Sequence, residues 1–284
     1  ASRWLKIPVI NQSFQTSDFA KLALVMYVAR LLSHKQNEIK SFKKTFLPMI
    51  LPVIIICGLI LPANLSTAAV LFVSCLVLMF IGRLPLKYLL GLIGSAILAL
   101  ALVLLIARSF PQVFPRASTW VNRVESFRHA DNPGNYQVEQ SMIAIGTGGI
   151  YGKGPGNSNQ RNFLPHPYSD FIYSIVIEEY GLLGGFIIIL LYMVFLYRSV
   201  RIAVRCRKTF GSLLVMGLSF SLVLQAIINM AVAANLMPVT GQPLPMVSMG
   251  GTSIWFTCIA VGIILSVSRS LEEEKRHKMK YHGA

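Results

Sequence analysis

The sequence is poor in charged residues, and acidic residues are the scarcest of them. Asp and Glu together number 11 of 284 residues, and all charged residues make up 13% of the chain, whereas a soluble domain carries about 25%. Hydrophobic residues reach 54%, and the mean hydropathy is +0.61. This composition excludes a soluble globular domain and makes each carboxylate inside an apolar segment a residue that needs a reason.

Cysteine is scarce as well. The four cysteines fall in apolar segments or in a basic loop, with no metal-ligand spacing and no position where oxidation would pair them. We assign no function to Cys57, Cys75, Cys206 and Cys258.

The chain also lacks an initiator Met and a signal peptide with a charged start and a small-residue cleavage site. Its first residues, "ASRWLKIPVINQSFQ", read like the middle of a larger protein. We therefore expect further membrane helices upstream.

Long apolar runs are abundant. A helix that spans a bilayer needs about 20 mostly apolar residues, and seven segments are candidates. They cover residues 18–34, 46–63, 66–82, 85–108, 170–197, 211–234 and 251–268. We predict an all-α polytopic membrane protein that forms one integral membrane domain over residues 1–284, with a large exterior loop at residues 109–169.

The net charge of +15 is distributed as membrane topology requires. Basic residues cluster after alternate apolar segments, as the positive-inside rule demands, so we reject nucleic acid as a partner and expect contact with membrane lipids. The clusters are Arg30, Lys35, Lys40, Lys43 and Lys44; Arg83 and Lys87; Arg198, Arg201, Arg205, Arg207 and Lys208; and Arg269, Lys275, Arg276, Lys278 and Lys280. The exterior then receives residues 1–17, 62–66, 109–169 and 235–251.

The loop at residues 109–169 is too long to be a passive connection. Its apolar stretch "QSMIAIGTGGIYG" predicts a short helix at the interface, and its glycine run lacks the G-x-x-x-x-G-K-[ST] pattern of a phosphate loop. We read these glycines as permitting tight turns. The loop cations are Arg116, Arg123, Arg128, Lys153 and Arg161. They either rest on anionic headgroups or bind an anionic, lipid-linked substrate.

Three carboxylates lie at or inside the fifth apolar segment. Asp170 stands at its exterior end, where Ser169 and Asp170 both suit a helix N-cap. On a straight helix Ser174 and Glu178 would share its side, with Glu178 about 12 Å deeper, whereas Glu179 would point nearly opposite and pair across helices. Intramembrane carboxylates usually face a bundle interior or a watery cavity, so a functional role for Asp170 and a polar network around Glu178 are the alternatives to a simple cap.

Further polar residues approach the same exterior face. Asp18 and Lys21 are three apart and either pair with each other, or Lys21 extends into an exterior cavity; Arg3 is a further exterior cation. Gln225 and Asn229, four apart on one face of the sixth segment, predict interhelical hydrogen bonds.

The stretch "MPVTGQPLPMVSMGGTS" predicts a re-entrant loop, because irregular backbone at membrane depth must be buried in protein or line a cavity. We expect one outward-facing cavity lined by Asp170, Lys21, Arg3 and the loop cations.

Three ordered motifs carry a resemblance that covers essentially the whole chain. They are "FQTSDFAKLAL", "YQVEQSMIAIGTGGIYGKGPGNSNQRNFLPHPYSDFIYSIVIEEYG" and "NLMPVTGQPLPMVSMGGTS". They resemble the SEDS family (shape, elongation, division and sporulation), the FtsW and RodA type of bacterial peptidoglycan glycosyltransferase with ten membrane helices. The seven predicted spans would match the last seven of these ten, and "GNSNQ" is more similar to the division type, FtsW, than to the elongation type, RodA.

The resemblance implies roles for particular residues. The essential carboxylate of the family's H-[TS]-D-F motif falls on Asp170, and positions proposed to handle the substrate diphosphate fall on Lys21 and Arg3. The chain departs from the family in three places. Tyr168 replaces the usual His, with His166 displaced by two, Thr16–Asp18 replaces P-[ST]-E, and Asn64 replaces an acid. Asp170 itself is intact.

The implied reaction is polymerisation of lipid II with release of undecaprenyl diphosphate, during septal wall synthesis. Asp170 would be the general base, or it would hold a divalent cation, Mg²⁺ or Mn²⁺, with the diphosphate; no organic cofactor is implied. We group the expected substrate-binding residues as Lys21, Arg3, Arg123, Lys153, Glu178 and Ser174.

The implied setting is the bacterial cytoplasmic (inner) membrane, with the active site facing the periplasm and a class B penicillin-binding protein and other divisome proteins as partners. Rival readings are a lipid II flippase, a RodA-like elongation polymerase and a scaffold for a transpeptidase. A flippase would be expected to show inverted repeats, and the sequence shows no internal repeat.

Overall fold

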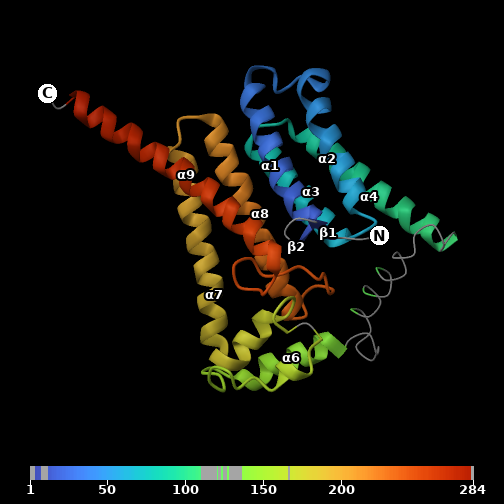
Figure 1. Ribbon diagram of the computed structural model, residues 1–284. Helices are drawn as coiled ribbons and strands as arrows, with labels where there is room; N and C mark the ends of the chain where they lie inside the picture. Colours follow the sequence, from blue (N-terminus) through green and yellow to red (C-terminus); the bar gives the residue numbers. More distant parts are fainter. Residues whose placement is uncertain are drawn as a thin grey trace.

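The computed structural model describes residues 4–7, 12–109, 120, 123, 127, 136–165 and 167–282. Within these ranges the chain is helical apart from one hairpin (Figure 1). The long helices are α1 (Thr16–His34), α2 (Leu47–Ile60), α3 (Leu65–Ile81), α4 (Leu86–Ser109), α7 (Ile172–Arg205), α8 (Thr209–Ala233) and α9 (Gly251–His282). A shorter helix, α6 (Tyr136–Gly148), lies across one end of the bundle.

A helix stands at each of the seven predicted spans. Five helical segments are long and apolar enough to cross a membrane: Phe42–Ile60, Leu86–Val103, Ile172–Arg205, Thr209–Ala233 and Ser253–Glu274. Helix α3 has 17 residues and counts as a shorter apolar helix, and α1 is not among the five. The all-helical membrane fold is confirmed, while the count of seven spans is not.

The core of the bundle lies where α1, α2, α3 and α8 meet. Val28 and Met49 are fully buried there, together with Leu71 of α3 and Val215 of α8. Gly217 of α8 lets the helices approach closely, since a Cβ at this position would stand 2.8 Å from a methyl group of Val25. This packing fixes α8 against α1, which matters because α8 carries the two amides that organise the candidate site.

A two-stranded hairpin precedes α1, and the sequence analysis did not predict it. Strand β1 (Trp4–Ile7) pairs antiparallel with β2 (Gln12–Gln15), with Trp4 opposite Gln15. Helix α1 follows β2 directly at Thr16.

Helix α7 is broken near its start. Gly181 has φ +69° and ψ −173°, a backbone conformation outside the helical region and accessible essentially only to glycine. The residues before Gly181 run at an angle to the long part after it, and the two parts meet beside α6 (Figure 1). This break lies beyond Glu178. The straight helix assumed from Asp170 to Glu178 is wrong at its other end, because α7 begins at Ile172 and Asp170 lies in the preceding turn.

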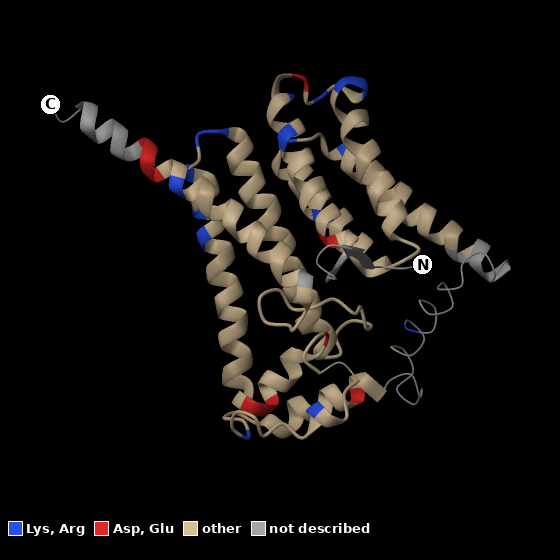
Figure 2. Ribbon diagram, in the orientation of Figure 1, with Lys and Arg blue, Asp and Glu red and all other residues tan. Residues whose placement is uncertain are grey.

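The charges follow the predicted alternation. Most of the Lys and Arg residues gather at the end of the bundle opposite α6 (Figure 2). The two ends of the bundle therefore differ in charge: one is basic, and the other carries α6 and the segment at residues 235–250.

Candidate functional site

The segment between α8 and α9 is irregular, as predicted, and residues in its middle are buried while Leu236 and Met249 near its ends are exposed. Within residues 235–250, Leu244 is fully buried, and Gln242 and Ser248 are nearly so. The Leu244 N–H donates to Ser248 Oγ, which in turn donates to the carbonyl of Ser169. Helix α7 also reaches this segment, because the Tyr192 hydroxyl donates to the carbonyl of Pro245. Buried irregular backbone of this kind walls a site at membrane depth.

Two amide side chains of α8 hold this segment in place. Gln225 Nε2 donates to the carbonyl of Pro243 at 2.9 Å. Asn229 Nδ2 donates both to the carbonyl of Gln242, at 2.7 Å, and to the carbonyl of Asp170, at 2.8 Å. The prediction of interhelical hydrogen bonds is confirmed for Gln225, whose Oε1 accepts from Lys21 Nζ of α1. Asn229 bonds instead to carbonyls outside the helices.

Asp170 lies in the turn that leads into α7, two residues before the first helical residue. Its carbonyl is held by Asn229, and its carboxylate Oδ1 accepts a hydrogen bond from Ser169 Oγ at 2.9 Å. The N-cap of α7 is Phe171, without a side-chain cap bond, so the reading of Asp170 as a capping residue is wrong. Among the described residues no ion pair includes Asp170.

The other carboxylate oxygen of Asp170 faces the segment at residues 235–250. A Cβ added at Gly241, which has φ +64°, would stand 3.5 Å from Asp170 Oδ2. Near this point two buried polar atoms, Asn229 Oδ1 and Thr240 Oγ1, have no hydrogen-bond partner among the residues described. Buried atoms of this kind are normally satisfied by water or a bound ligand, so the surroundings of Asp170 offer polar groups to a hydroxyl.

Lys21 of α1 is held by Gln225 of α8, one helical turn from Asn229, which holds Asp170. Its ammonium pairs with Asp18 at 2.8 Å and donates to Gln225 Oε1 at 3.2 Å. The pairing of Lys21 with Asp18 is confirmed, and both residues also line a cavity of about 40 Å³ between α1, α8 and α9. Gln225 and Asn229 are four residues apart, about 6 Å along the helix axis. The contacts that α8 makes with Lys21 and with the Asp170 backbone therefore lie one turn apart on one face of that helix.

The expected single cavity includes cations outside the described residues and stays a prediction. Asp170 is not among the described residues that line the cavity beside Lys21. Of the expected cations, the exposed Arg123 donates to the carbonyl of Val239 at 3.1 Å, on that same segment. Arg3, Arg116 and Arg128, and also His166, lie outside the described residues.

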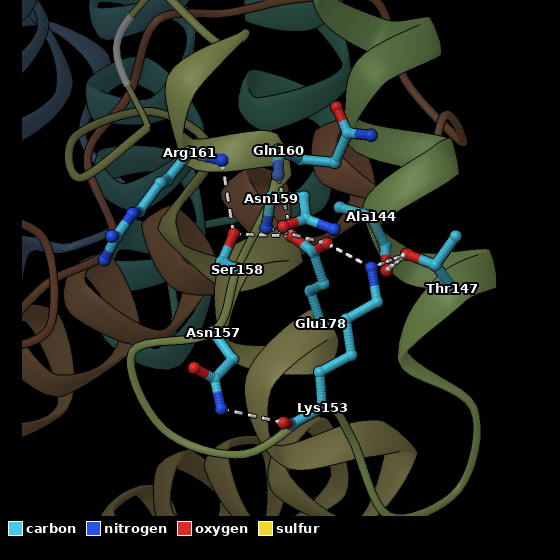
Figure 3. Close-up of polar contacts among 9 residues, drawn as sticks. All are labelled: Ala144, Thr147, Lys153, Asn157, Ser158, Asn159, Gln160, Arg161 and Glu178. Carbon is cyan, nitrogen blue, oxygen red and sulfur yellow. Dashed lines mark hydrogen bonds and ion pairs between the residues drawn. The ribbon is translucent and has the colours of Figure 1, made fainter.

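Glu178 and Lys153, both expected to bind substrate, form an ion pair with each other. Glu178 is fully buried, and its Oε1 lies 2.6 Å from Lys153 Nζ (Figure 3). Its carboxylate also accepts hydrogen bonds from Ser158 Oγ and from the backbone N–H groups of Asn159 and Gln160. Both oxygens are therefore occupied by the loop at residues 153–160, and the polar network expected around Glu178 exists without a free acceptor for a ligand. These contacts give Glu178 and Lys153 a structural role, and their expected binding of substrate stays a prediction.

Ser174, also expected to bind substrate, is engaged within the protein. It is fully buried, and its hydroxyl donates to the carbonyl of Phe171 at 2.7 Å. Serine hydroxyls commonly bond to a carbonyl one turn back in this way. Glu179, expected to pair across helices, makes no ion pair within the described ranges.

The glycine run that precedes this loop packs against the break in α7. The N–H groups of Lys153 and Gly154 donate to the carbonyls of Glu178 and Glu179, each at 2.9 Å. A Cβ at Gly148 or Gly152 would overlap the backbone of α7. These glycines therefore allow two stretches of backbone to touch, and the N–H groups of residues 153 and 154 face protein carbonyls.

Glu178→Gln is expected to destabilise the fold by about 2 kcal/mol. This is less than the 3–5 kcal/mol for a fully enclosed pair, because the Lys153 side chain keeps 28% of its exposure. An amide also presents a donor to Ser158 or Gln160, which are themselves donors. Thermal unfolding in detergent would measure the loss, and an unchanged midpoint would contradict a structural role.

Asn64 explains how the chain tolerates the loss of the family acid there. It is the N-cap of α3, and its Oδ1 accepts a hydrogen bond from the N–H of Thr67 at 3.2 Å. Asn and Asp are about equally good caps, so either residue can do this.

Two substitutions of Asn64 test whether this position needs a helix cap or a negative charge. Asn64→Asp is expected to leave stability nearly unchanged, while Asn64→Ala costs about 1 kcal/mol. Thermal unfolding of both variants checks this, and equal losses from the two would show that Asn64 acts otherwise than as a cap.

Sequence reasoning missed part of the site. The side chains of Ser248 and Gln242 were not singled out, and Ser169 was considered only as a helix cap. Gln242 Nε2 donates to Thr67 Oγ1 at 2.7 Å and ties the segment at residues 235–250 to α3. The available signal was the density of polar residues within the predicted re-entrant loop. In the described part of the chain, no group of three or more His, Cys, Asp or Glu residues could hold a metal ion.

Comparison with known proteins agrees with this architecture. Residues 1–273 match the FtsW, RodA and SpoVE family model, described as a cell cycle protein. Stage V sporulation protein E of Bacillus subtilis is 38% identical over 90% of this chain and 69% of its own length. A probable peptidoglycan glycosyltransferase FtsW of Trichlorobacter lovleyi is 34% identical over 96% of this chain and 70% of its length.

Solved structures agree as well. A peptidoglycan synthase complex, studied for its coordination of polymerisation and crosslinking, matches with a TM-score of 0.71 and 26% identity, over 95% of this chain and 74% of that chain. The rod shape determining protein RodA of Thermus thermophilus matches with a TM-score of 0.62 and 25% identity, over 95% and 69%. The chain therefore belongs to the FtsW, RodA and SpoVE family, the SEDS family that its motifs indicated, and is a multi-pass membrane protein.

Proposed function

We propose that this protein is a peptidoglycan glycosyltransferase that polymerises lipid II during septal cell-wall synthesis. The observation that carries the proposal is the state of Asp170. Its backbone is fixed by Asn229, its carboxylate is free of any ion pair among the described residues, and buried polar atoms without partners lie close by. The other acid first expected to act there, Glu178, is fully engaged in structure.

The chemistry follows from this arrangement. The 4-hydroxyl of the acceptor GlcNAc attacks C1 of a lipid-linked MurNAc, so that a new C1–O bond forms and the bond from C1 to the diphosphate oxygen breaks. Asp170 accepts the hydroxyl proton as general base. The electron pair leaves with undecaprenyl diphosphate, whose negative charge is stabilised by cations. Lys21 is the described candidate, with Arg123 and Arg3 as further proposals.

The residues around Asp170 could hold a divalent cation only if the substrate supplied further ligands. Asp170 supplies one carboxylate, and no described cluster of three ligands surrounds it. Mg²⁺ is commonly held by one or two carboxylates together with substrate phosphates. A cation bound in this way would neutralise charge on the diphosphate, and we propose that activity depends on Mg²⁺ or Mn²⁺ for this reason.

The proposed setting is the bacterial inner membrane. The basic end of the bundle would face the cytoplasm by the positive-inside rule, which directs Asp170 and α6 to the periplasm. We further propose a class B penicillin-binding protein as partner, supported by the likeness to a synthase complex that coordinates polymerisation with crosslinking.

The test is a polymerisation assay on the full-length protein purified with its penicillin-binding partner. The complex is incubated with lipid II, with Mg²⁺ or with EDTA, and the glycan products are resolved by gel. Glycan polymer that requires the divalent cation is expected. Polymer in EDTA at the same rate would remove the cation from the proposal, and no polymer beside an active control enzyme would direct attention to lipid II transport.

A further inference from the structure

A cavity of about 180 Å³ lies between α7 and α9 at the basic end of the bundle. It is separate from the site around Asp170, which lies at the other end of α7, and no catalytic role described above uses it. The lining residues are Arg198, Arg201, Ile202, Arg205, Ser268, Leu271 and Glu272.

The three arginines of this cavity share one side of α7. They stand at positions i, i+3 and i+7, which fall on one face of a helix. The guanidinium of Arg201 lies 5.7 Å from the centre of the Tyr197 ring, a cation–π contact that orients it. Three cations therefore converge on a small volume.

Arg198, Arg201 and Arg205 form no ion pair with any residue that the structure describes. Among the described residues, Lys208 pairs with Glu274 at 3.9 Å and Arg269 with Glu273 at 2.8 Å, whereas none of the three cavity arginines takes part in a pair. Glu272 is the one carboxylate in the lining. The cavity thus carries three guanidinium groups against one acid, an excess of positive charge that favours an anion.

The shape and setting of the cavity favour the phosphate of a lipid. A guanidinium fork matches phosphate oxygens, and Ser268 adds a hydroxyl. Ile202 and Leu271 give the cavity an apolar wall, and exposed apolar side chains follow along both helices away from the basic end, with Leu191 62% exposed and Leu265 60% exposed. An acyl chain can lie on such a surface, which a free phosphate does not need.

We propose that this cavity binds one anionic phospholipid of the cytoplasmic leaflet through its phosphate. Basic pockets between membrane helices on this side are known to hold anionic headgroups. The positive-inside rule accounts for arginines at this end of the bundle, but it does not require them to surround a cavity together with a hydroxyl and an apolar wall.

The experiment uses the full-length protein in detergent and counts bound lipid by native mass spectrometry. Phosphatidylglycerol, phosphatidylcholine and inorganic phosphate are titrated separately. The test variant is Arg198→Gln/Arg201→Gln/Arg205→Gln. The matched control, Lys43→Gln/Lys87→Gln/Arg207→Gln, removes three exposed cations that do not line the cavity.

Wild type and the control are expected to retain one phosphatidylglycerol, and the test variant is expected to bind it about tenfold or more weakly. Equal loss in both variants would overturn the proposal in favour of diffuse surface attraction. Binding of phosphatidylcholine as tight as that of phosphatidylglycerol, or of inorganic phosphate as tight as the lipid, would overturn it as well. Should the triple variant fail to fold, Arg201→Gln alone gives the same comparison.

Discussion

Asp170→Asn is expected to lower the rate of lipid II polymerisation by about 100- to 10,000-fold, the range that general-base catalysis contributes. The amide is nearly isosteric and keeps an oxygen for the Ser169 hydroxyl, and the Asn229 contact is to the backbone carbonyl, which the substitution leaves intact. The free energy of unfolding should therefore change by no more than about 0.5 kcal/mol. The loss would lie in the chemistry and not in the fold.

The matched control for this variant is Glu139→Gln. Glu139 is an exposed acid of α6 at the same end of the bundle, and its substitution removes the same charge without touching the site. Wild-type polymerisation from the control and none from a stable Asp170→Asn protein are expected. An equal loss from both would mean that the net charge of this surface, and not the carboxylate of Asp170, supports the reaction.

Gly181→Ala is expected to cost at least about 4 kcal/mol, in the range of the most damaging single substitutions. An added Cβ would overlap the carbonyl oxygen of Ile150, and the φ of +69° with ψ of −173° is strained for any residue with a side chain. The break in α7 orients the turn that carries Asp170, so the folded yield should fall sharply. Fluorescence-detected size-exclusion chromatography after heating measures this.

Gly146→Ala provides the comparison. Gly146 lies on the exposed side of α6, and nothing stands within 4 Å of an added Cβ. Alanine is favoured over glycine in a helix by about 0.8–1.0 kcal/mol, so this variant should melt slightly above wild type. A Gly181→Ala protein as stable as the Gly146→Ala protein would show that the break in α7 is not required.

The helices could be predicted because each has a local signal, whereas the proposed catalytic role of Asp170 came from the family resemblance. Apolar runs of sufficient length place the helices, and Asp170 stands out as a charge at the edge of such a run. Gln225 and Asn229 were predictable for the same reason, since two amides four residues apart in an apolar helix need partners. The structure supplies those partners, from the segment at residues 235–250, the turn at Asp170 and Lys21.

The roles of Glu178 and Ser174 could not be predicted in this way. Helical periodicity placed both on the side of Asp170, but it does not show that α7 begins only at Ile172. It also says nothing about the break at Gly181, against which a loop packs, or about Lys153 of that loop, 25 residues from Glu178. Whether a glycine adopts a positive φ depends on what it packs against, here the backbone at Ile150 and Gly152. Contacts between distant stretches of chain decided which acid is structural and which is available.

The measurement that tests the central claim most directly compares glycan polymer formed per folded molecule by wild type, Asp170→Asn and Glu178→Gln, each as the full-length protein with its partner, below the melting temperature of all three. We predict no polymer from a stable Asp170→Asn protein and near wild-type polymer from the less stable Glu178→Gln protein. Undiminished polymer from Asp170→Asn, or its loss from folded Glu178→Gln, would contradict the assignment of chemistry to Asp170 and of structure to Glu178.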